Sequence, residues 1–421
     1  MKEGFKETEL GSIPSDWSIV KFDEVAELRH GYQFRNYDFT ESGIKILKIT
    51  QIKGNETVDL SSCSFINENR LDEFERVIIN KGDILVALTG ATIGKIARFN
   101  SEEIVLQNYR VGNFFPLNST SLSKDYFFQF LRSSFFYNQI LARQTQSAQQ
   151  NIGKEDINNM SMFFPPIKEQ KAIANLLTAF DDKIENLRAQ NQTLEQTAQT
   201  IFKEWFGKYQ IGDELPEGWR VEELDNLLEL IIDYRGKTPK KLGMEWSEKG
   251  IPALSAKTIK NGKIVRRDAM NFGSPELYKI WMKDELQKGD ILLTSEAPLG
   301  EMYYINDDTK FILSQRLFAL RVNEKITSEY LYDYLFSKYG QHQLNARASG
   351  STVQGIRQSE LRKIEVIVPE ENIMKKASLI FRSSIEKKAI NSKQIQTLTK
   401  TRDALLPKLM RGEIRVSGFK K

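Results

Sequence analysis

Lys81-Gly82-Asp83-Ile84-Leu85 recurs letter for letter as Lys288-Gly289-Asp290-Ile291-Leu292, at an offset of 207 residues (288 minus 81). Further matches flank this pair in the same order and at similar offsets. They join Pro14-x-x-Trp17 to Pro216-x-x-Trp219, Asp125–Leu131 to Glu329–Leu335, Ala142–Ile152 to Ala346–Ile356, and Phe180–Glu185 to Phe381–Glu386. Collinear matches over the whole chain indicate an internal duplication. We therefore expect two related domains, which suits a chain of 421 residues.

Each copy opens with a segment of mixed strand and helix character. Short runs such as Ile44–Ile49, Asp83–Leu88 and Asp290–Thr294 are separated by Gly and Asn, which is typical of strands joined by turns. Aromatic residues within 126–140 and 330–339 have helical spacing, which favours core-packing helices over a platform for stacking nucleic-acid bases. The predicted fold class is α+β, with two tandem α/β domains.

A long helix is predicted after Pro165-Pro166. Apolar residues recur there every seven positions, with a second set four positions behind, which is the a/d pattern of a coiled coil. The predicted pairing positions are Ile173, Leu177, Phe180, Ile184, Leu187, Asn191, Leu194, Ala198, Ile201 and Trp205. Asn191 is polar at an a position, where such a residue typically fixes the register at some cost in stability.

A second, less regular helix is predicted after Pro369. Its apolar stripe consists of Met374, Phe381, Ile385, Ile395, Leu398, Leu405 and Leu409, whereas Lys388 and Arg402 fall where the first copy has Leu187 and Ile201. About 40 residues of helix span roughly 60 Å, and only Gly207–Gly212 link the first helix to the second domain. We therefore predict an antiparallel coiled coil with a globular domain at each end. The predicted boundaries are domains at 1–164 and 207–367, and helices at 165–206 and 368–421.

Composition excludes several functional classes. The chain has 40% apolar and 28% charged residues and a formal net charge of +4, and no stretch approaches the roughly 18 apolar residues of a membrane span. Cys63 is the only cysteine, and His30 and His342 are the only histidines, so disulfides, cysteine-built zinc sites and histidine-based catalysis lack components. The first ten residues show no signal-peptide pattern, so a cytoplasmic protein is expected.

Several motifs together resemble the specificity subunit of type I restriction–modification systems. They follow one another in both copies and cover nearly the whole chain. The motifs are Pro-x-x-Trp at each domain start, Gly82-Asp83-Ile84-Leu85 with Thr89-Gly90-Ala91-Thr92-Ile93-Gly94-Lys95, Ile201-Phe202-Lys203-Glu204-Trp205-Phe206, and Arg402-Asp403-x-Leu405-Leu406-Pro407-Lys408-Leu409-x-x-Gly412-Glu413-Ile414. The second copy departs from Thr-Gly-Ala-Thr, because Thr294–Gly300 reads Thr-Ser-Glu-Ala-Pro-Leu-Gly.

The resemblance implies a non-catalytic protein that recognises double-stranded DNA. Such subunits have two target-recognition domains, each reading one half of a split, asymmetric site, and two helical regions that set the spacer. They dock two methyltransferase subunits, which use S-adenosylmethionine to methylate adenine. The enlarged complex with motor-nuclease subunits cleaves unmethylated DNA using ATP and magnesium. The resemblance therefore implies that these cofactors belong to the partners.

Local patterns that imitate catalytic motifs lack essential parts. Gly90–Lys95 is one residue short of a Walker A loop, and Ile96 stands where a Ser or Thr would hold magnesium. Phe164-Pro165-Pro166-Ile167 does not match the Asn/Asp-Pro-Pro-aromatic motif of amino-methyltransferases. Glu169-Gln170-Lys171 imitates a nuclease fragment at the start of the heptad helix, where we expect a solvated face.

Candidate DNA contacts are the polar, amide-rich and basic segments at the domain edges, since Gln and Asn can pair with adenine, Arg with guanine, and Ser, Thr and Lys with phosphate. In the first copy they are Arg29, His30, Tyr32, Gln33, Arg35, Thr89, Thr92, Lys95, Gln107, Arg110, Arg143, Gln144, Gln146, Ser147, Gln149, Gln150 and Asn151. In the second they are Tyr234, Arg235, Lys237, Thr238, Lys240, Lys241, Ser295, Glu296, Gln315, Arg316, Arg347, Ser349, Ser351, Thr352 and Gln354.

Alternatives stay open at this stage. Any of these side chains could be a solvated loop residue, and Gln107, Arg110, Gln315 and Arg316 also fit the polar edge of a sheet. A stand-alone two-headed DNA-binding regulator would bind its site without partners. A coiled-coil scaffold between proteins would show no salt-dependent DNA binding.

Overall fold

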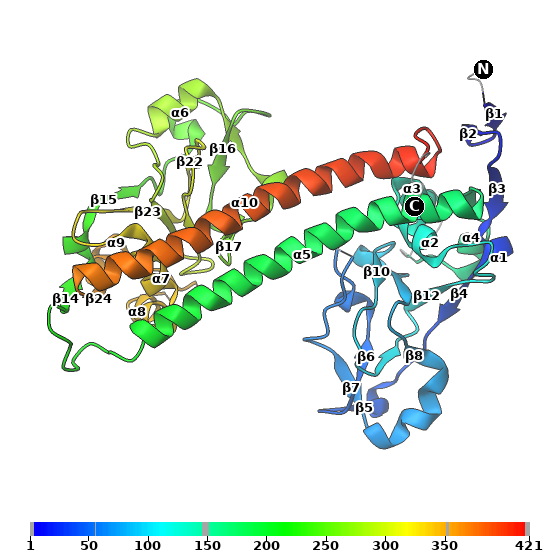
Figure 1. Cartoon of the computed structure of the whole chain (residues 1–421), viewed down its shortest axis with the longest axis horizontal. Helices are drawn as coiled ribbons and strands as arrows, with labels where there is room; N and C mark the ends of the chain where they lie inside the picture. The colour runs from blue at the N-terminus through cyan, green and yellow to red at the C-terminus, as the bar shows by residue number, and fades with distance from the viewer. Residues whose placement is uncertain (1–3, 55, 145–150, 351–352, 417–421) are drawn as a thin grey trace. The chain divides into compact units, whose positions relative to one another are not determined.

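A computed structural model describes residues 4–54, 56–144, 151–350 and 353–416, and Figure 1 shows the course of the chain. The chain divides into two compact units. The first unit comprises residues 1–185 and 396–421, and the second unit comprises residues 186–395. Each boundary lies inside a long helix, so each unit contains one copy of the globular domain and a part of both helices.

The repeated Lys-Gly-Asp-Ile-Leu segment forms the same turn and central strand in both units. Gly82 and Gly289 have φ values of +87° and +99°, a left-handed conformation that glycine adopts without steric cost. The carboxylates of Asp83 and Asp290 then accept hydrogen bonds from the backbone N–H three residues earlier, at 3.0 and 2.8 Å. The following residues form fully buried strands. These strands are β9 (Ile84–Ala87) and β20 (Ile291–Thr294).

The strands and short helices of both units follow one plan. The other strands of the first unit are β1 (Phe5–Thr8), β2 (Gly11–Pro14), β3 (Ser18–Lys21), β4 (Ala26–His30), β5 (Phe39–Thr40), β6 (Ile44–Leu47), β7 (Ser64–Ile66), β8 (Ile78–Ile79), β10 (Ile96–Arg98), β11 (Val105–Gln107), β12 (Val111–Pro116) and β13 (Ser161–Phe164). Those of the second are β14 (Arg220–Glu223), β15 (Leu228–Asp233), β16 (Ile251–Leu254), β17 (Ile259–Lys260), β18 (Lys263–Ile264), β19 (Phe272–Gly273), β21 (Met302–Tyr304), β22 (Ile312–Leu313), β23 (Leu317–Val322) and β24 (Glu365–Val368). The short helices are α1 (Phe22–Val25), α2 (Lys124–Leu131), α3 (Ser134–Gln144), α4 (Lys154–Asn158), α6 (Pro275–Trp281), α7 (Ser328–Phe336), α8 (Lys338–Ala346) and α9 (Gln358–Leu361).

The sheet topology repeats the duplication. The main antiparallel sheet has the order β10-β9-β12-β4 in the first unit and β21-β20-β23-β15 in the second. A second sheet contains one parallel pair in each unit, β6 with β11 and β16 with β22. A further antiparallel pair, β3 with β13 or β14 with β24, joins the start of each domain to its end. The predicted α+β class with two tandem domains is confirmed.

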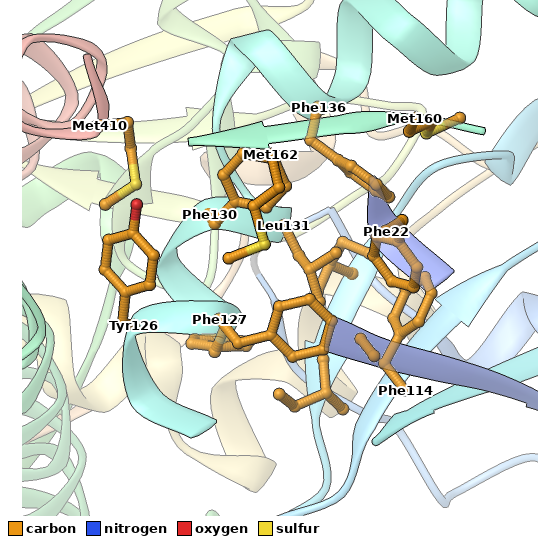
Figure 2. Packing of buried hydrophobic residues seen from close by; sticks show 14 of the residues in the cluster. Phe22, Phe114, Tyr126, Phe127, Phe130, Leu131, Phe136, Met160, Met162 and Met410 are labelled. Carbon is orange, nitrogen blue, oxygen red and sulfur yellow. The ribbon is translucent and has the colours of Figure 1, made fainter. Parts of the chain in front are cut away.

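Aromatic side chains fill the core of the first unit, as Figure 2 shows. Phe22, Phe114, Phe127 and Phe136 are fully buried, and the centroid of the Phe22 ring lies 5.2 to 6.3 Å from the other three. Burying a side chain of this size stabilises the fold by about 2 to 3 kcal/mol. The aromatic-rich segments predicted as core-packing helices therefore belong to the core.

Two equivalent tyrosines tie α2 and α7 to the strand that precedes each long helix. The Tyr126 hydroxyl donates to the Phe163 carbonyl in β13 at 2.9 Å, and the Tyr330 hydroxyl donates to the Ile367 carbonyl in β24 at 2.7 Å. Both rings are fully buried, and burial raises the pKa of both hydroxyls well above its usual value. Both hydroxyls therefore act as neutral structural donors.

Long helices follow each domain and pair antiparallel. They are α5 (Ile167–Trp205) and α10 (Glu371–Met410). In the second unit Glu195 forms an ion pair with Lys388, and the Phe202 ring lies 6.2 Å from the Phe381 ring. A later residue of α5 therefore contacts an earlier residue of α10, which shows that the two helices run in opposite directions. In the described part of the chain no helix is both long and apolar enough to cross a membrane.

Polar residues interrupt the apolar seam of the helix pair and find partners across it. Asn391 Nδ2 donates to Asn191 Oδ1 at 2.9 Å, and both side chains are buried. The predicted polar a position is therefore matched by an asparagine on α10 that the heptad pattern did not single out. Arg402 stands where the first copy has the apolar Ile201, and it donates to Asp181 Oδ1 at 2.7 Å in the first unit.

The predicted seam holds along most of α5 and fails at its end. Ile173, Leu177, Ile184, Leu187 and Ala198 are buried, whereas Phe180, Leu194, Ile201, Ile395, Leu398 and Leu405 are half-buried. Trp205 was predicted in the seam, but its side chain is 39% exposed, while Phe202 and Phe206 are buried. The register shifts there because this end of the helix packs on the domain core, and Phe206 contacts the Tyr330 ring at 5.0 Å.

The start of α5 is structural, so the predicted solvated face at Glu169-Gln170 is wrong. Gln170 is fully buried; its amide donates to the Ser121 and Pro165 carbonyls, both at 2.9 Å, and its oxygen accepts from Ser123 N–H at 2.9 Å. Glu169 accepts a hydrogen bond from Trp17 Nε1 at 2.9 Å. A buried amide needs such partners, and the sequence alone did not show them.

Candidate nucleic-acid interface

Three segments that are distant in the sequence meet at the end of β9. Leu88 N–H donates to the Arg110 carbonyl, and Ile152 N–H donates to the Leu88 carbonyl, both at 3.1 Å. Thr89 and Asn151 face each other as an isolated antiparallel bridge. We call this place, formed by residues 88–89, 110 and 151–152, the first junction. It brings together residues from three of the predicted DNA-contacting segments.

The second unit repeats the same hydrogen bonds at the end of β20. Ser295 N–H donates to the Arg316 carbonyl, and Ile356 N–H donates to the Ser295 carbonyl, both at 2.9 Å. Glu296 and Gly355 form the corresponding bridge. A Cβ on Gly355 would lie 3.0 Å from the Glu296 Cβ, which is tighter than an ordinary contact, so a larger residue would require the neighbouring chain to shift. Residues 295–296, 316 and 355–356 form the second junction.

A cleft of about 510 Å³ opens at the second junction. It is lined by Arg235, Gly236, Ser295, Glu296, Gln315, Arg316, Ser349, Val353, Gly355, Ile356 and Arg357. Six of these residues were predicted as DNA contacts, whereas Arg357 and Gly355 were missed because they lie just beyond the amide-rich segment. Three arginines against one carboxylate give the cleft a positive charge, which suits a polyanion.

Acidic neighbours hold the arginines of the second unit. Arg235 donates to Asp233 from Nε at 2.8 Å and from Nη2 at 2.7 Å. Arg316 Nε lies 2.8 Å from Glu296 Oε1. Arg347 is 3.9 Å from Glu360. Exposed pairs of this kind add little stability, so their main effect is to orient the guanidinium groups.

The basic candidates of the first unit have a different environment. Arg29, His30, Gln33, Arg35 and Arg110 are exposed. The guanidinium of Arg110 lies 5.6 Å from the Tyr109 ring, and its Nε donates to the Tyr109 hydroxyl at 3.1 Å. Arg29 pairs with Glu27 at 2.9 Å. The exposed edge of the first junction is therefore basic, with an aromatic neighbour where the second has a carboxylate.

The fold buries four predicted contacts or engages their polar groups in hydrogen bonds. Gln107 is buried and its amide donates to the Arg29 and Val111 carbonyls at 3.0 and 2.7 Å. Ser295 is also buried, at the second junction. The Tyr234 hydroxyl accepts from Asp284 N–H at 2.8 Å, and burial raises its pKa. Lys237 donates to the Trp281 carbonyl at 3.0 Å, and burial lowers its pKa.

The other candidates make local contacts or differ in their exposure. Arg143 donates to the Gln139 and Asn159 carbonyls at 3.2 and 3.1 Å. Thr238 caps a turn through Lys241 N–H at 3.3 Å. Of the remainder, Tyr32, Lys240, Asn151 and Gln354 are exposed, and Thr89, Thr92 and Lys95 are half-buried. Gln146, Ser147, Gln149, Gln150, Ser351, Thr352 and the side chain of Gln144 lie outside the described residues.

The segment that imitates a phosphate loop is a short turn. Gly90–Thr92 forms a 3-10 turn, and Gly94 N–H donates back to the Ala87 carbonyl at 2.9 Å. Gly94 has a φ of +75° and packs against Tyr137. Within the described residues no cluster of three or more His, Cys, Asp and Glu side chains is arranged to hold a metal ion.

Comparison with known proteins gives one consistent match. The family described as "Type I restriction modification DNA specificity domain" matches residues 14–196 and 216–400. The MjaIX specificity subunit of Methanocaldococcus jannaschii is 25% identical over 98% of this chain and 96% of its own. The HindI specificity subunit of Haemophilus influenzae is 24% identical over 95% and 100%. The crystal structure of the type I restriction–modification S subunit from M. genitalium has a TM-score of 0.59, with 18% identity over 97% and 99% of the two chains.

Proposed function

Because the chain belongs to the type I restriction–modification DNA specificity family, we propose that it reads a bipartite, asymmetric DNA sequence, with one half-site for each unit. As a specificity component, the chain recognises DNA and is not itself an enzyme. The observation that carries the proposal is the pair of junctions. They repeat the same backbone hydrogen bonds but present different side chains.

The difference between the junctions supports an asymmetric site. The turn at the first junction carries Tyr109 and Arg110, and that at the second carries Gln315 and Arg316. Thr89 at the first bridge is replaced by Glu296 at the second. Base edges are distinguished by their donors and acceptors. Two different sets of donors and acceptors on one backbone frame therefore suit two different half-sites.

The charge of the second cleft supports DNA as the ligand. Arg235, Arg316 and Arg357 line it together, and arginine binds both phosphate oxygens and guanine. The proposed binding has a large electrostatic part, so its affinity should fall steeply as salt is raised.

Methyltransferase subunits are the proposed direct partners, and motor-nuclease subunits are proposed to join through them. Exposed apolar side chains on α10 in the second unit support a docking surface: Ile373, Leu379, Ile380 and Ile390 are 36 to 62% exposed. S-adenosylmethionine, ATP and magnesium are proposed to be held by these partners. A Leu379→Asp variant should co-purify less methyltransferase than an Arg362→Ala variant, which changes a surface outside α10.

The proposal is tested by mapping methylated adenines on random-sequence DNA with and without the partner methyltransferase. The chain alone should transfer no methyl group, and the complex should methylate one two-part sequence. Methyl transfer by the chain alone would contradict the proposal. Tight, sequence-specific binding that needs no partner and supports no methylation would instead favour a stand-alone regulator.

A further inference from the structure

An arginine occupies the same place in both junctions. Tyr109-Arg110 ends the three-residue connection 108–110 between β11 and β12, and Gln315-Arg316 ends the equivalent connection 314–316 between β22 and β23. In each case the strand before the turn belongs to the parallel pair and the strand after it to the main sheet. The carbonyl of each arginine is held by the end of the central strand β9 or β20. Each turn is therefore fixed by a hydrogen bond to the residue that directly follows a fully buried strand.

Each guanidinium group contacts a neighbouring side chain through its Nε, Arg110 by a hydrogen bond and Arg316 by an ion pair. Arg110 Nε donates to the Tyr109 hydroxyl at 3.1 Å, and Arg316 Nε lies 2.8 Å from Glu296 Oε1. Within the described part of the chain, the terminal nitrogens of both arginines make no hydrogen bond, and both side chains are exposed. In each arginine Nε therefore contacts a neighbouring side chain, while the two terminal nitrogens remain available as donors.

The backbone at Arg316 adds a further constraint. Its φ is +65°, in the left-handed region that non-glycine residues rarely adopt. Such strain persists where the surrounding structure holds it, and it concentrates at functional positions. The neighbouring Gly355 lets its chain approach Glu296 closely. The backbones of these two residues form a bridge, which fixes the position of Glu296 beside Arg316.

We propose that Arg110 and Arg316 each read one guanine, in the first and second half-sites respectively, with Tyr109 and Glu296 as positioning residues; this rests on the proposed function of one half-site for each unit. Guanine presents two acceptors, O6 and N7, side by side in the major groove, and a guanidinium offers two parallel donors that match them. A phosphate accepts donors from many directions and needs no such orientation. Glu296 would also repel the full negative charge of a phosphate placed beside it more strongly than the partial charges of a base edge.

The positioning neighbours differ in strength. The contact between Arg316 and Glu296 fixes the guanidinium more firmly than the hydroxyl of Tyr109 fixes Arg110, because attraction between two opposite charges is stronger than attraction between a charge and a hydroxyl dipole. We therefore expect the guanine of the second half-site to be specified more strictly than that of the first.

The test uses the full chain in complex with its methyltransferase partner and a DNA library randomised over both half-sites. Arg316→Gly removes the side chain and relieves the left-handed backbone, so the fold is preserved. We expect it to lower the preference for guanine at one position of the second half-site about ten- to hundredfold, and to leave the first half-site unchanged. Arg110→Ala should do the same at one position of the first half-site. Arg362→Ala, which removes an arginine outside the cleft, is the matched control and should change neither half-site.

Two conservative variants separate positioning from simple structural support. Glu296→Gln and Tyr109→Phe should weaken the preference a fewfold at the position read by the adjacent arginine, and at no other position. Arg316→Lys keeps the charge but loses the paired donors, so it should still lose the guanine preference.

Three results would overturn the inference. A uniform loss of affinity for all sequences, with the salt dependence reduced by about one phosphate contact, would make these arginines phosphate contacts. Unchanged base preference in Arg316→Gly and Arg110→Ala would remove both from the reading surface. Variants that shift several positions at once would indicate a general disturbance of the unit. If the wild-type complex selects no two-part sequence, the proposed function itself fails, which is a different outcome.

Discussion

Gln129 in the first unit and Asp333 in the second occupy equivalent positions of the repeat but have opposite environments. The Gln129 amide donates to Asp181 Oδ2 at 3.2 Å, and its oxygen accepts from Arg132 Nη1 at 3.1 Å. Asp333 is buried, and within the described residues its carboxyl makes no hydrogen bond or ion pair. Burial raises its pKa to about 8, although Lys388 lowers it in part. At this position the first unit therefore has an amide with hydrogen-bond partners, whereas the second has a buried carboxyl for which the protonated form is favoured.

The contrast shows what the duplication has kept. The buried strands, the Lys-Gly-Asp turns and the backbone hydrogen bonds of the junctions are common to both units. Polar side chains differ both in the interior, as at Gln129 and Asp333, and at the junctions, as at Thr89 and Glu296. A backbone frame that tolerates such exchange can carry two different reading surfaces on one fold.

The largest expected effect comes from breaking the charged network of the first unit. The Arg132 side chain is only 3% exposed and pairs with Glu56 and with Asp181. Arg132→Ala should destabilise the first unit by about 3 kcal/mol, because it removes a buried cation that pairs with two partly buried carboxylates, of which Asp181 keeps Arg402 as a partner. Lys81→Ala, which removes an exposed pair with Glu102, should cost less than about 1 kcal/mol. Hydrogen exchange of the α2 amides measures both.

Acid titration tests the pairing of Arg132 with Asp181 in a second way. Burial raises the pKa of Asp181, but the charges and hydrogen bonds of Arg132 and Arg402 outweigh burial, so the net pKa is lowered from 3.8. The stabilisation from this carboxylate is therefore present above about pH 3.8 and is lost as the pH falls further. The difference between wild type and Arg132→Ala should shrink on acidification, and a difference that grows would contradict the assigned pairing.

A smaller effect of opposite sign is expected for Asp333→Asn in the second unit. The pKa of Asp333 is raised to about 8 in the folded protein. As the pH rises above the pKa of aspartate in the unfolded chain, the unfolded state ionises first, so the folded protein becomes less stable. The variant should match wild type near pH 4 and be more stable than wild type at pH 8 and above. Urea unfolding at the two pH values measures the difference. Equal stability at pH 9 would show that the carboxyl is hydrated or paired.

The smallest effect is expected at the asparagine pair between the long helices. Asn391→Leu should cost about 1 to 3 kcal/mol, because it leaves the buried Asn191 amide without its partner. The double variant Asn191→Leu with Asn391→Leu should recover most of this loss, since it removes both polar groups. A double-mutant cycle by urea unfolding gives the coupling. Additive single effects would mean that the two amides do not depend on each other.

Local periodicity made much of the fold predictable from the sequence. The heptad of α5 and the buried Ile and Leu after each Lys-Gly-Asp turn are patterns of neighbouring residues, and the structure has them as predicted. Trp205 was assigned to the wrong face, because the packing of Phe202 and Phe206 on the domain core overrides the heptad there.

The sequence predicted which segments carry the polar candidate residues, but it did not predict the role of each residue. Gln107 at the end of β11 has the sequence context of a solvent-facing amide, and only the folded chain brings the Arg29 and Val111 carbonyls to it. Likewise Glu296 and Arg316 are 20 residues apart (316 minus 296), and no local pattern predicts that they pair. Contacts between loops depend on the register of whole sheets, which the sequence does not display.

If each unit reads its own half-site, exchanging one domain should change one half of the target sequence. Residues 11–160 are replaced by the corresponding domain of a relative with a different target, and methylated adenines are mapped for the complex with the partner methyltransferase. The account predicts a new sequence in one half-site and an unchanged sequence in the other. A change in both halves, or in neither, would contradict it.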